Sequence, residues 1–212
     1  MDFKVFLKLV PKINSAILPG EAAHLKMAPV ERIALMKDLD IEALNPRNAA
    51  VMMLLYPKED MTHIVLIVRN SYKGVHSSQV AFPGGKVEID DLTNERAAIR
   101  ETEEEIGVRA EQIRIVRAFS EIYIPPSNFK VFPFLGYCKT TPVFNPDPRE
   151  VVGIIELPLK DFLDDRLVQI NRMSTSYTQD VDIPAFMFGK FVIWGATAMM
   201  LSELKEVLKS VF

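Results

Sequence analysis

The spacing of apolar residues changes several times along the chain, and each change marks a predicted element. Residues 1–45 are predicted to be helical, and from Glu31 to Leu44 the apolar positions suit a helix that lies on a core. That face consists of Ile33, Leu35, Met36, Leu39, Ile41 and Leu44. Pro46 ends the segment, because the residue before a proline disfavours the helical region.

The C-terminal residues return to helical spacing. Gly195–Val211 predicts an amphipathic helix with one face on the core. The apolar face consists of Ala198, Leu201, Leu204, Leu208 and Val211, and the polar face of Lys205, Glu206 and Lys209. We therefore expect Lys205 to lie on the outside of the molecule.

Short apolar runs typical of strands occupy the middle of the chain. Ala49–Tyr56 and His63–Arg69 flank a predicted turn at Pro57–Asp60. Gln79–Phe82 predicts a short strand that ends at Pro83–Gly85. Further runs are Ile113–Ile124, Val131–Cys138 and Val151–Leu157. The order of elements predicts a mixed sheet with helices packed on it, an α/β or α+β fold.

One more helix is predicted between these strands, from Asn94 to Ile106. Thr93 suits its N-cap, and Gly107 suits a left-handed C-terminal cap. The residues expected to pack on the sheet are Ala98, Ile99, Thr102 and Ile106.

Three glutamates share another face of this helix. Glu101, Glu104 and Glu105 fall within an arc of roughly 100°. Each like-charged pair at helical spacing costs about 0.2–0.5 kcal/mol, and a divalent cation would turn that repulsion into attraction. Oxygen ligands favour magnesium or manganese over zinc. The alternative for such an acidic run is a solvated surface.

The neighbours of these glutamates support a site. Arg100 can reach Glu104 four residues on, and Gly84-Gly85 allows the backbone to pass close to a ligand. Further oxygen ligands could come from Glu88, Asp90 and Asp91.

Together these residues resemble the signature of the Nudix hydrolases: a glycine, a glutamate, and then Arg-Glu, an apolar residue, Glu-Glu and glycine. The segment Arg100–Val108 matches its second half, with Thr102 in place of the apolar residue. Gly85 matches the first glycine, Asp91 stands where the first glutamate is expected, and one extra residue near Leu92 follows.

The resemblance implies an α/β/α sandwich and a metal-dependent hydrolase of a diphosphate bond. It implies catalytic roles for Arg100, Glu101, Glu104 and Glu105, and Mg²⁺ or Mn²⁺ bound by Glu101, Glu104, Glu105 and Gly85. Residues 1–45 are then an N-terminal helical extension, and residues 46–212 the Nudix domain. A homodimer is open on the same analogy.

A second resemblance points to the coenzyme A diphosphatases within this family. It rests on Arg69, His76, Gln79-Val80 and Phe82–Gly85, and on the late segment Phe191–Thr197. The departures are Ser78 for the usual glycine and Lys73-Gly74 for the usual Leu-Arg. The resemblance implies that the substrate is a coenzyme A-like nucleotide, bound by Arg69, His76, Gln79 and Lys86.

Other interpretations remain for these residues and for the function. His76 could be a hydrogen-bonded loop residue, Arg69 could pair with the acidic loop, and Trp194 could be core. Hydrolysis of ADP-ribose or a nucleoside triphosphate is an alternative activity. A non-catalytic module that binds a nucleotide is an alternative of another class.

Composition sets the cellular setting expected for the chain. The net charge of −3 over 212 residues gives no reason to expect a nucleic-acid partner. No apolar run approaches the roughly 18 residues of a membrane span. The single cysteine, Cys138, lies in an apolar run and is expected to be buried and inert, which suits a cytoplasmic protein.

Overall fold

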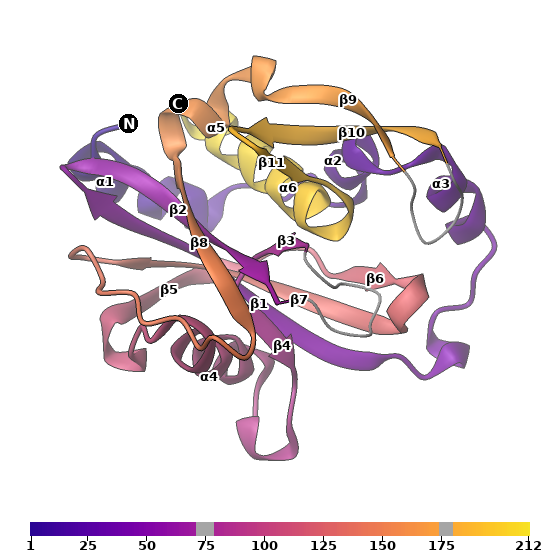
Figure 1. Cartoon of the computed structure of the whole chain (residues 1–212), viewed down its shortest axis with the longest axis horizontal. Helices are drawn as coiled ribbons and strands as arrows, with labels where there is room; N and C mark the ends of the chain where they lie inside the picture. The colour runs from indigo at the N-terminus through magenta and orange to yellow at the C-terminus, as the bar shows by residue number, and fades with distance from the viewer. Residues whose placement is uncertain (71–78, 174–179) are drawn as a thin grey trace.

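The computed structural model describes residues 1–70, 79–173 and 180–212, and His76, Ser78 and Lys73-Gly74 lie outside these ranges. The helices are α1 (Phe3–Ser15), α2 (Glu21–His24), α3 (Val30–Met36), α4 (Asn94–Ile106), α5 (Leu159–Leu163) and α6 (Gly195–Val211). The strands are β1 (Arg47–Lys58), β2 (Met61–Arg69), β3 (Val80–Ala81), β4 (Gly84–Lys86), β5 (Ile113–Ala118), β6 (Ile122–Ile124), β7 (Phe129–Cys138), β8 (Val151–Pro158), β9 (Val168–Met173), β10 (Val181–Phe188) and β11 (Phe191–Ile193). Figure 1 shows their arrangement.

The first eight strands form one mixed sheet. Its order is β3-β2-β1-β7-β5, with β4 paired to β1, β6 to β7 and β8 to β2. The central pair β1 and β7 is parallel, and the other pairs are antiparallel. The prediction of a mixed sheet with helices is therefore confirmed. The predicted turn after β1 is shorter than expected, because Pro57 and Lys58 belong to the strand.

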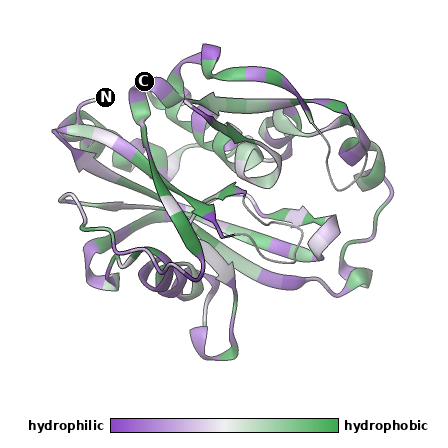
Figure 2. Cartoon of the chain, in the orientation of Figure 1, coloured by the Kyte–Doolittle hydropathy of each residue, from purple (hydrophilic) through white to green (hydrophobic). Residues whose placement is uncertain are grey.

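Side chains of β1 alternate between two cores, one on each face of the sheet. Met53 and Leu55 belong to the core that also contains α1 and α6. Met52, Leu54 and Tyr56 belong to the core beneath α4. Since successive side chains of a strand point to opposite faces, helices on both faces bury every one of these positions. Figure 2 shows the result, with apolar strands at the centre and a largely hydrophilic α4 outside.

A second, three-stranded sheet was not predicted. Its order is β11-β10-β9, and it lies beside α2 and α6 in Figure 1. In β9 polar residues interrupt the apolar positions and Ile170 is exposed, and β10 contains Pro184, which is rare inside a sheet. Strands of this kind carry little periodicity for a sequence-based interpretation to detect.

The second sheet also explains why the prediction for Lys205 is wrong. Lys205 is buried, and its Nζ donates to the carbonyl oxygen of Asp164 at 2.9 Å. The ammonium lies 5.7 Å from the ring centroid of Phe186 in β10 and pairs with Asp165. These elements cover Lys205, whereas Glu206 is half-buried and Lys209 is exposed as expected.

The predicted helix from Glu31 to Leu44 is wrong in length and in its buried face. It ends at Met36, and Ile33 and Leu35 are exposed. Its buried residue is Arg32, whose guanidinium donates to the carbonyl oxygen of Tyr123. The contact with β6 rather than the apolar spacing orients this helix.

Two simpler expectations can be compared directly. Cys138 is buried as predicted, and burial raises the pKa of its thiol to about 11. In the described part of the chain no helix is both long and apolar enough to cross a membrane.

Candidate active site

The glutamate helix α4 begins and ends where its capping residues predict. The Thr93 hydroxyl accepts a hydrogen bond from the backbone N–H of Arg96, and Gly107 has a φ of 74°. Only a residue free of a Cβ adopts that conformation without strain, which explains the stop. Ala98, Thr102 and Ile106 are buried against the sheet as expected.

Arg100 ties the loop before α4 to the glutamates on it. Its guanidinium donates to Glu104 at 2.9 Å, as the helical spacing predicts, and to Glu101 at 2.9 Å. It also donates to both oxygens of Asp91, at 2.8 and 2.9 Å, and to the carbonyl oxygen of Lys86 at 3.1 Å. Arg100 thus sets the relative positions of loop and helix.

Asp91 has a structural role toward Arg100. Its side chain is buried, and the hydrogen bonds from Arg100 hold its pKa below the usual range despite burial. Both oxygens are occupied by Arg100, and one also accepts from the backbone N–H of Glu88. Leu92, the extra residue of the signature, has a φ of 59° and is 80% exposed. The insertion therefore bulges into solvent and leaves the contact between Asp91 and Arg100 intact.

Glu105 is the most deeply buried acid of the helix. Its carboxylate accepts from the backbone N–H of Gly84 at 2.8 Å and from Arg69 at 3.2 Å. Burial is the largest influence and raises the pKa of Glu105 to about 7, against the opposing effect of Arg69 and Gly84. Arg69 was considered as a partner of the acidic loop, but it pairs with the helix instead.

Glu101 lies one turn before Glu105 and against Gly85. Burial raises the pKa of Glu101 above its usual range, although Arg100 opposes that change. A Cβ on Gly85 would lie 2.5 Å from the carboxylate carbon of Glu101, so the glycine leaves room for that carboxylate. The close approach expected of the glycine pair is therefore present.

The site fits a divalent cation in its chemistry. No three acidic, histidine or cysteine side chains within the described ranges are arranged as a metal cluster. The carboxylates of Glu101 and Glu104 pair with Arg100, and that of Glu105 pairs with Arg69. Yet Glu101 and Glu105 both have a raised pKa from burial, which a bound cation would offset. With the Gly85 carbonyl they form an all-oxygen donor set. Glu104 is more exposed and reaches the site through Arg100.

Glu150 was missed by the sequence interpretation. It lies in the loop before β8, and its charge raises the pKa of both Glu101 and Glu105. The loop is held on α4 because the backbone N–H of Asp147 donates to the carbonyl oxygen of Glu105 at 3.0 Å. No local spacing links Glu150 to the helix, so only the fold brings it to the site.

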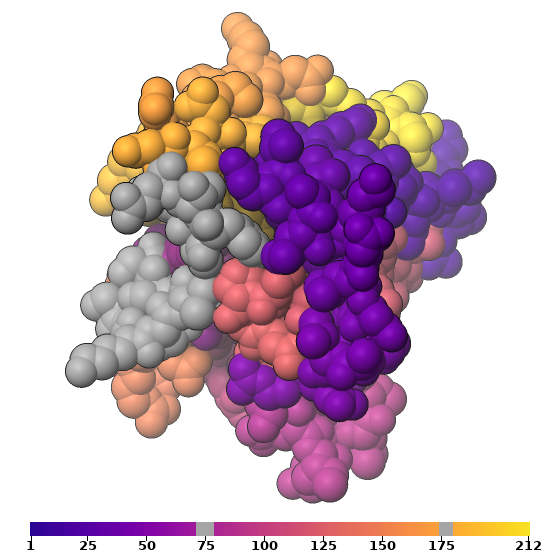
Figure 3. Space-filling model, turned by 90° about the vertical axis from the view of Figure 1, so that its right-hand side faces the viewer, coloured from indigo at the N-terminus to yellow at the C-terminus, as the bar shows by residue number. Residues whose placement is uncertain are grey.

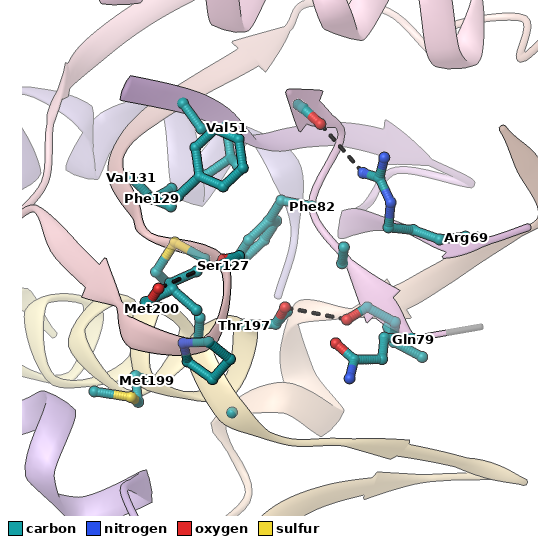
Figure 4. A pocket seen from close by; sticks show the side chains of 18 of the residues that line it. Val51, Arg69, Gln79, Phe82, Ser127, Phe129, Val131, Thr197, Met199 and Met200 are labelled. Atoms are coloured by element: carbon teal, nitrogen blue, oxygen red, sulfur yellow. Dashed lines mark hydrogen bonds between the residues drawn. The ribbon is translucent and has the colours of Figure 1, made fainter. Parts of the chain in front are cut away.

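A cavity of about 270 Å³ opens beside the glycine loop. Three of the four predicted substrate residues line it, namely Arg69, Gln79 and Lys86, while His76 lies outside the described ranges. Figure 4 shows its walls, in which apolar side chains predominate. These include Val51, Phe82, Phe129, Val131, Met199 and Met200. Trp194 is half-buried and also lines the cavity.

Comparison with known proteins agrees with this geometry. The NUDIX domain model matches residues 46–176, which include the whole of the glycine loop and α4. The chain belongs to the Nudix family. The Nudix fold expected from the signature is thereby confirmed. The boundary at residue 45 between extension and domain stays a prediction.

Two relatives show how far the similarity extends. Nudix hydrolase 15, mitochondrial, from Arabidopsis thaliana is 32% identical over 182 residues, which cover 79% of this Nudix chain and 61% of the relative. The uncharacterized Nudix hydrolase NudL from Enterobacter sp. (strain 638) is 30% identical over 168 residues, or 77% of this chain and 83% of the relative. The chain thus spans less than two thirds of the plant protein.

Solved structures support the fold. The Nudix hydrolase RenU from M. smegmatis aligns with a TM-score of 0.54 at 16% identity, over 79% of this chain and 88% of its own. A MutT/nudix family protein from Enterococcus faecalis aligns with a TM-score of 0.50 at 19% identity, over 84% of this chain and 73% of its own.

Replacement by alanine is expected to lower activity at Gly85 and stability at Gly84. In Gly85→Ala the new Cβ displaces the Glu101 carboxylate, so kcat/KM should fall by about 10²-fold, as for a misplaced catalytic group. The melting temperature should change little, since the displaced group is the end of a side chain. In Gly84→Ala the Cβ meets the Ala50 carbonyl oxygen at 2.3 Å, so that variant should lose stability. Equal melting temperatures for the two variants would contradict this distinction.

Asp91→Asn is expected to weaken the site through Arg100. The neutral amide offers one acceptor where the carboxylate offers two, so Arg100 should hold the glutamates less firmly. Loss of such a supporting contact typically costs about 10- to 100-fold in metal affinity or activity. The concentration of Mg²⁺ that gives half-maximal activity should rise. Asp90→Asn, at an exposed neighbouring position, is the control and should leave that concentration unchanged.

Proposed function

We propose that this chain hydrolyses the diphosphate bond of coenzyme A or an acyl-CoA with Mg²⁺ or Mn²⁺. The products are adenosine 3′,5′-bisphosphate and 4′-phosphopantetheine or its acyl derivative. The observation that carries the proposal is the cavity beside the glycine loop. Most of the described residues of the segment that resembles coenzyme A diphosphatases line it, namely Arg69, Gln79, Val80, Phe82, Gly84 and Gly85.

The positions of the side chains support a division of roles. Glu101, Glu105 and the Gly85 carbonyl would hold the metal ion, with Glu104 as a third ligand or as the base for water. Arg100 orients Glu101 and Glu104 through the bonds described above. The ion, when bound, lowers the pKa of a coordinated water and neutralises charge on the diphosphate.

In the proposed reaction Arg69 binds a phosphate group of the substrate, and water attacks the diphosphate. Arg69 bonds Glu105 and Gly84 through the single nitrogen Nη1, and its planar guanidinium suits a phosphate group on the cavity side. The oxygen of water bonds to one phosphorus, and the bond from that phosphorus to the bridging oxygen breaks. The bridging oxygen leaves on the other phosphate, so one diphosphate and one water give two phosphate monoesters.

A substrate panel tests the proposal. The full chain is incubated with coenzyme A, an acyl-CoA, ADP-ribose, NADH and dinucleoside polyphosphates, with Mg²⁺ and Mn²⁺ compared, and products are separated by chromatography. We expect the highest kcat/KM for coenzyme A or its acyl derivative. A higher kcat/KM for ADP-ribose than for coenzyme A would contradict the proposal and identify ADP-ribose as the preferred substrate. Binding without hydrolysis of any compound would favour the non-catalytic nucleotide module.

A further inference from the structure

Arg32 is a buried cation with no acidic partner among the described residues. The residue is 8% exposed, and its Nη2 donates to the carbonyl oxygen of Tyr123 at 2.5 Å. Within the described ranges no carboxylate oxygen lies within 4.0 Å of its guanidinium, and no other group accepts a hydrogen bond from it. Residues 71–78 and 174–179 contain no aspartate or glutamate, so they cannot supply the missing carboxylate.

Such a position is unfavourable for the protein alone. A buried charge is costly unless it is paired, and one carbonyl satisfies only one of the five N–H groups of an arginine. Lys205, which is also buried, has the carboxylate of Asp165 at 3.0 Å. An anionic ligand would therefore stabilise the buried guanidinium of Arg32.

Arg32 lies where a bound ligand could supply that anion. Arg32 lines the cavity beside the glycine loop and also a second cavity of about 690 Å³ beneath α3. Glu21 and Glu121 both line the second cavity, and Glu121 pairs with Lys130. The first cavity is lined by Arg32, Arg69 and Lys86 and by no acidic residue of the described chain. It therefore favours a ligand with more than one negative group.

The strand order gives the separation between the glycine loop and β6, to which Arg32 bonds. Lys86 of β4 pairs with Ala49 of β1, Ala49 with Val131 of β7, and Val131 with Ile122 of β6. Three strand spacings separate β4 from β6, which is roughly 14 Å. Since Arg32 bonds β6, it lies across the cavity from the loop that would hold the diphosphate. Figure 3 shows the N-terminal segment lying against the β6 region on this side of the molecule.

We propose that Arg32 binds a phosphate monoester that the substrate carries in addition to its diphosphate. The cavity then selects nucleoside diphosphate derivatives with a further phosphate on the nucleoside. In coenzyme A that group is the 3′-phosphate, and the identification of this group rests on the proposed function. Arg32 precedes residues 46–176 matched by the domain model, so the N-terminal segment supplies this part of the specificity.

The test compares ligands that differ only in this phosphate. Wild type, Arg32→Gln and Arg32→Lys are assayed with coenzyme A and with 3′-dephospho-coenzyme A. Glutamine keeps a polar side chain but carries no charge, and lysine restores the charge. Arg117→Met is the control, because Arg117 donates to the backbone carbonyls of Ile13 and Ala16 and lines neither cavity.

The expected effect is confined to the phosphorylated substrate. Arg32→Gln should raise KM for coenzyme A by roughly 10- to 100-fold, the range for a hydrogen bond to a charged group, with kcat little changed. KM for the dephospho compound should stay within about twofold. Arg32→Lys should recover part of the loss, and Arg117→Met should leave the ratio of the two KM values at the wild-type value.

A binding measurement separates this proposal from the proposed function. Calorimetry with adenosine 3′,5′-bisphosphate and with AMP requires no turnover. If coenzyme A is not hydrolysed but Arg32→Gln weakens only the bisphosphate, the substrate assignment fails and the role of Arg32 stands. If wild type binds both nucleotides equally, or if Arg32→Gln weakens both equally, Arg32 is a structural residue and the proposal is overturned. Equal binding of the two nucleotides by wild type overturns the proposal even if the variants do not fold.

Discussion

Glu101→Gln is expected to lower kcat by about 10³-fold without unfolding the protein. A metal ion supplies several kcal/mol of stabilisation to the transition state, and about 1.4 kcal/mol corresponds to tenfold in rate. Glutamine keeps the shape of the side chain but removes the charge that would hold the ion. The partly buried Glu101 already has a raised pKa because of burial, so the neutral replacement should be tolerated by the fold.

Turnover and melting temperature are measured together for this variant. Glu95→Gln is the matched control, since Glu95 is exposed in the first turn of the same helix. Its kcat should equal that of wild type. Near-wild-type turnover in Glu101→Gln would show that Glu101 does not bind the metal ion. A large fall in melting temperature would instead identify a structural role.

Glu203→Ala is expected to lower the free energy of unfolding by about 3 kcal/mol or more, because several donors lose a charged acceptor, at about 1–3 kcal/mol each. Glu203 in α6 is fully buried and joins two distant segments, around α2 and at Ser120. It accepts hydrogen bonds from the backbone N–H of Gly20 at 3.0 Å, from Ser120 N–H and Oγ–H at 3.1 and 2.5 Å, and it pairs with His24 at 3.3 Å. Truncation leaves these buried donors without an acceptor.

Urea unfolding measures the effect, and Glu206→Ala is the control. Glu206 is on the same helix and pairs with Lys26 at 3.0 Å on the surface, where a salt bridge contributes at most about 1 kcal/mol. Equal losses in the two variants would contradict the assigned role of Glu203.

The contribution of Glu203 should also depend on pH. Burial opposes ionisation of this carboxyl, but the hydrogen bonds from His24 and Ser120 outweigh it, and the pKa is lowered. A lowered folded-state pKa means that the stabilisation is present above the unfolded-state pKa and is lost as pH falls through the folded-state value. The difference between wild type and Glu203→Ala should therefore shrink in acid. A constant difference from neutral to acid pH would show that the charge of Glu203 contributes little.

Local features of the sequence predicted the helix that carries the chemistry, with both of its ends. Thr93 and Gly107 act within one turn of themselves, and the contact between Arg100 and Glu104 follows from helical spacing alone. Strands β1 and β2 were also predictable, because each is a nearly continuous apolar run with residues buried on both faces. Strand β4 was not, since Pro83–Gly85 was predicted to end a strand and Gly84–Lys86 is not apolar. Helix caps, helical spacing and apolar strand segments depend only on residues close in sequence, so the sequence alone determines them.

The tertiary structure decided everything that needed a partner distant along the chain. It brought Arg69 to Glu105, placed Glu150 beside the glutamate helix, and left Arg32 buried against β6. It also formed the second sheet and covered Lys205 with it. A polar residue is predicted to be exposed because its neighbours in sequence are polar. Whether it is in fact buried depends on which distant element packs over it, and that follows only from the whole fold.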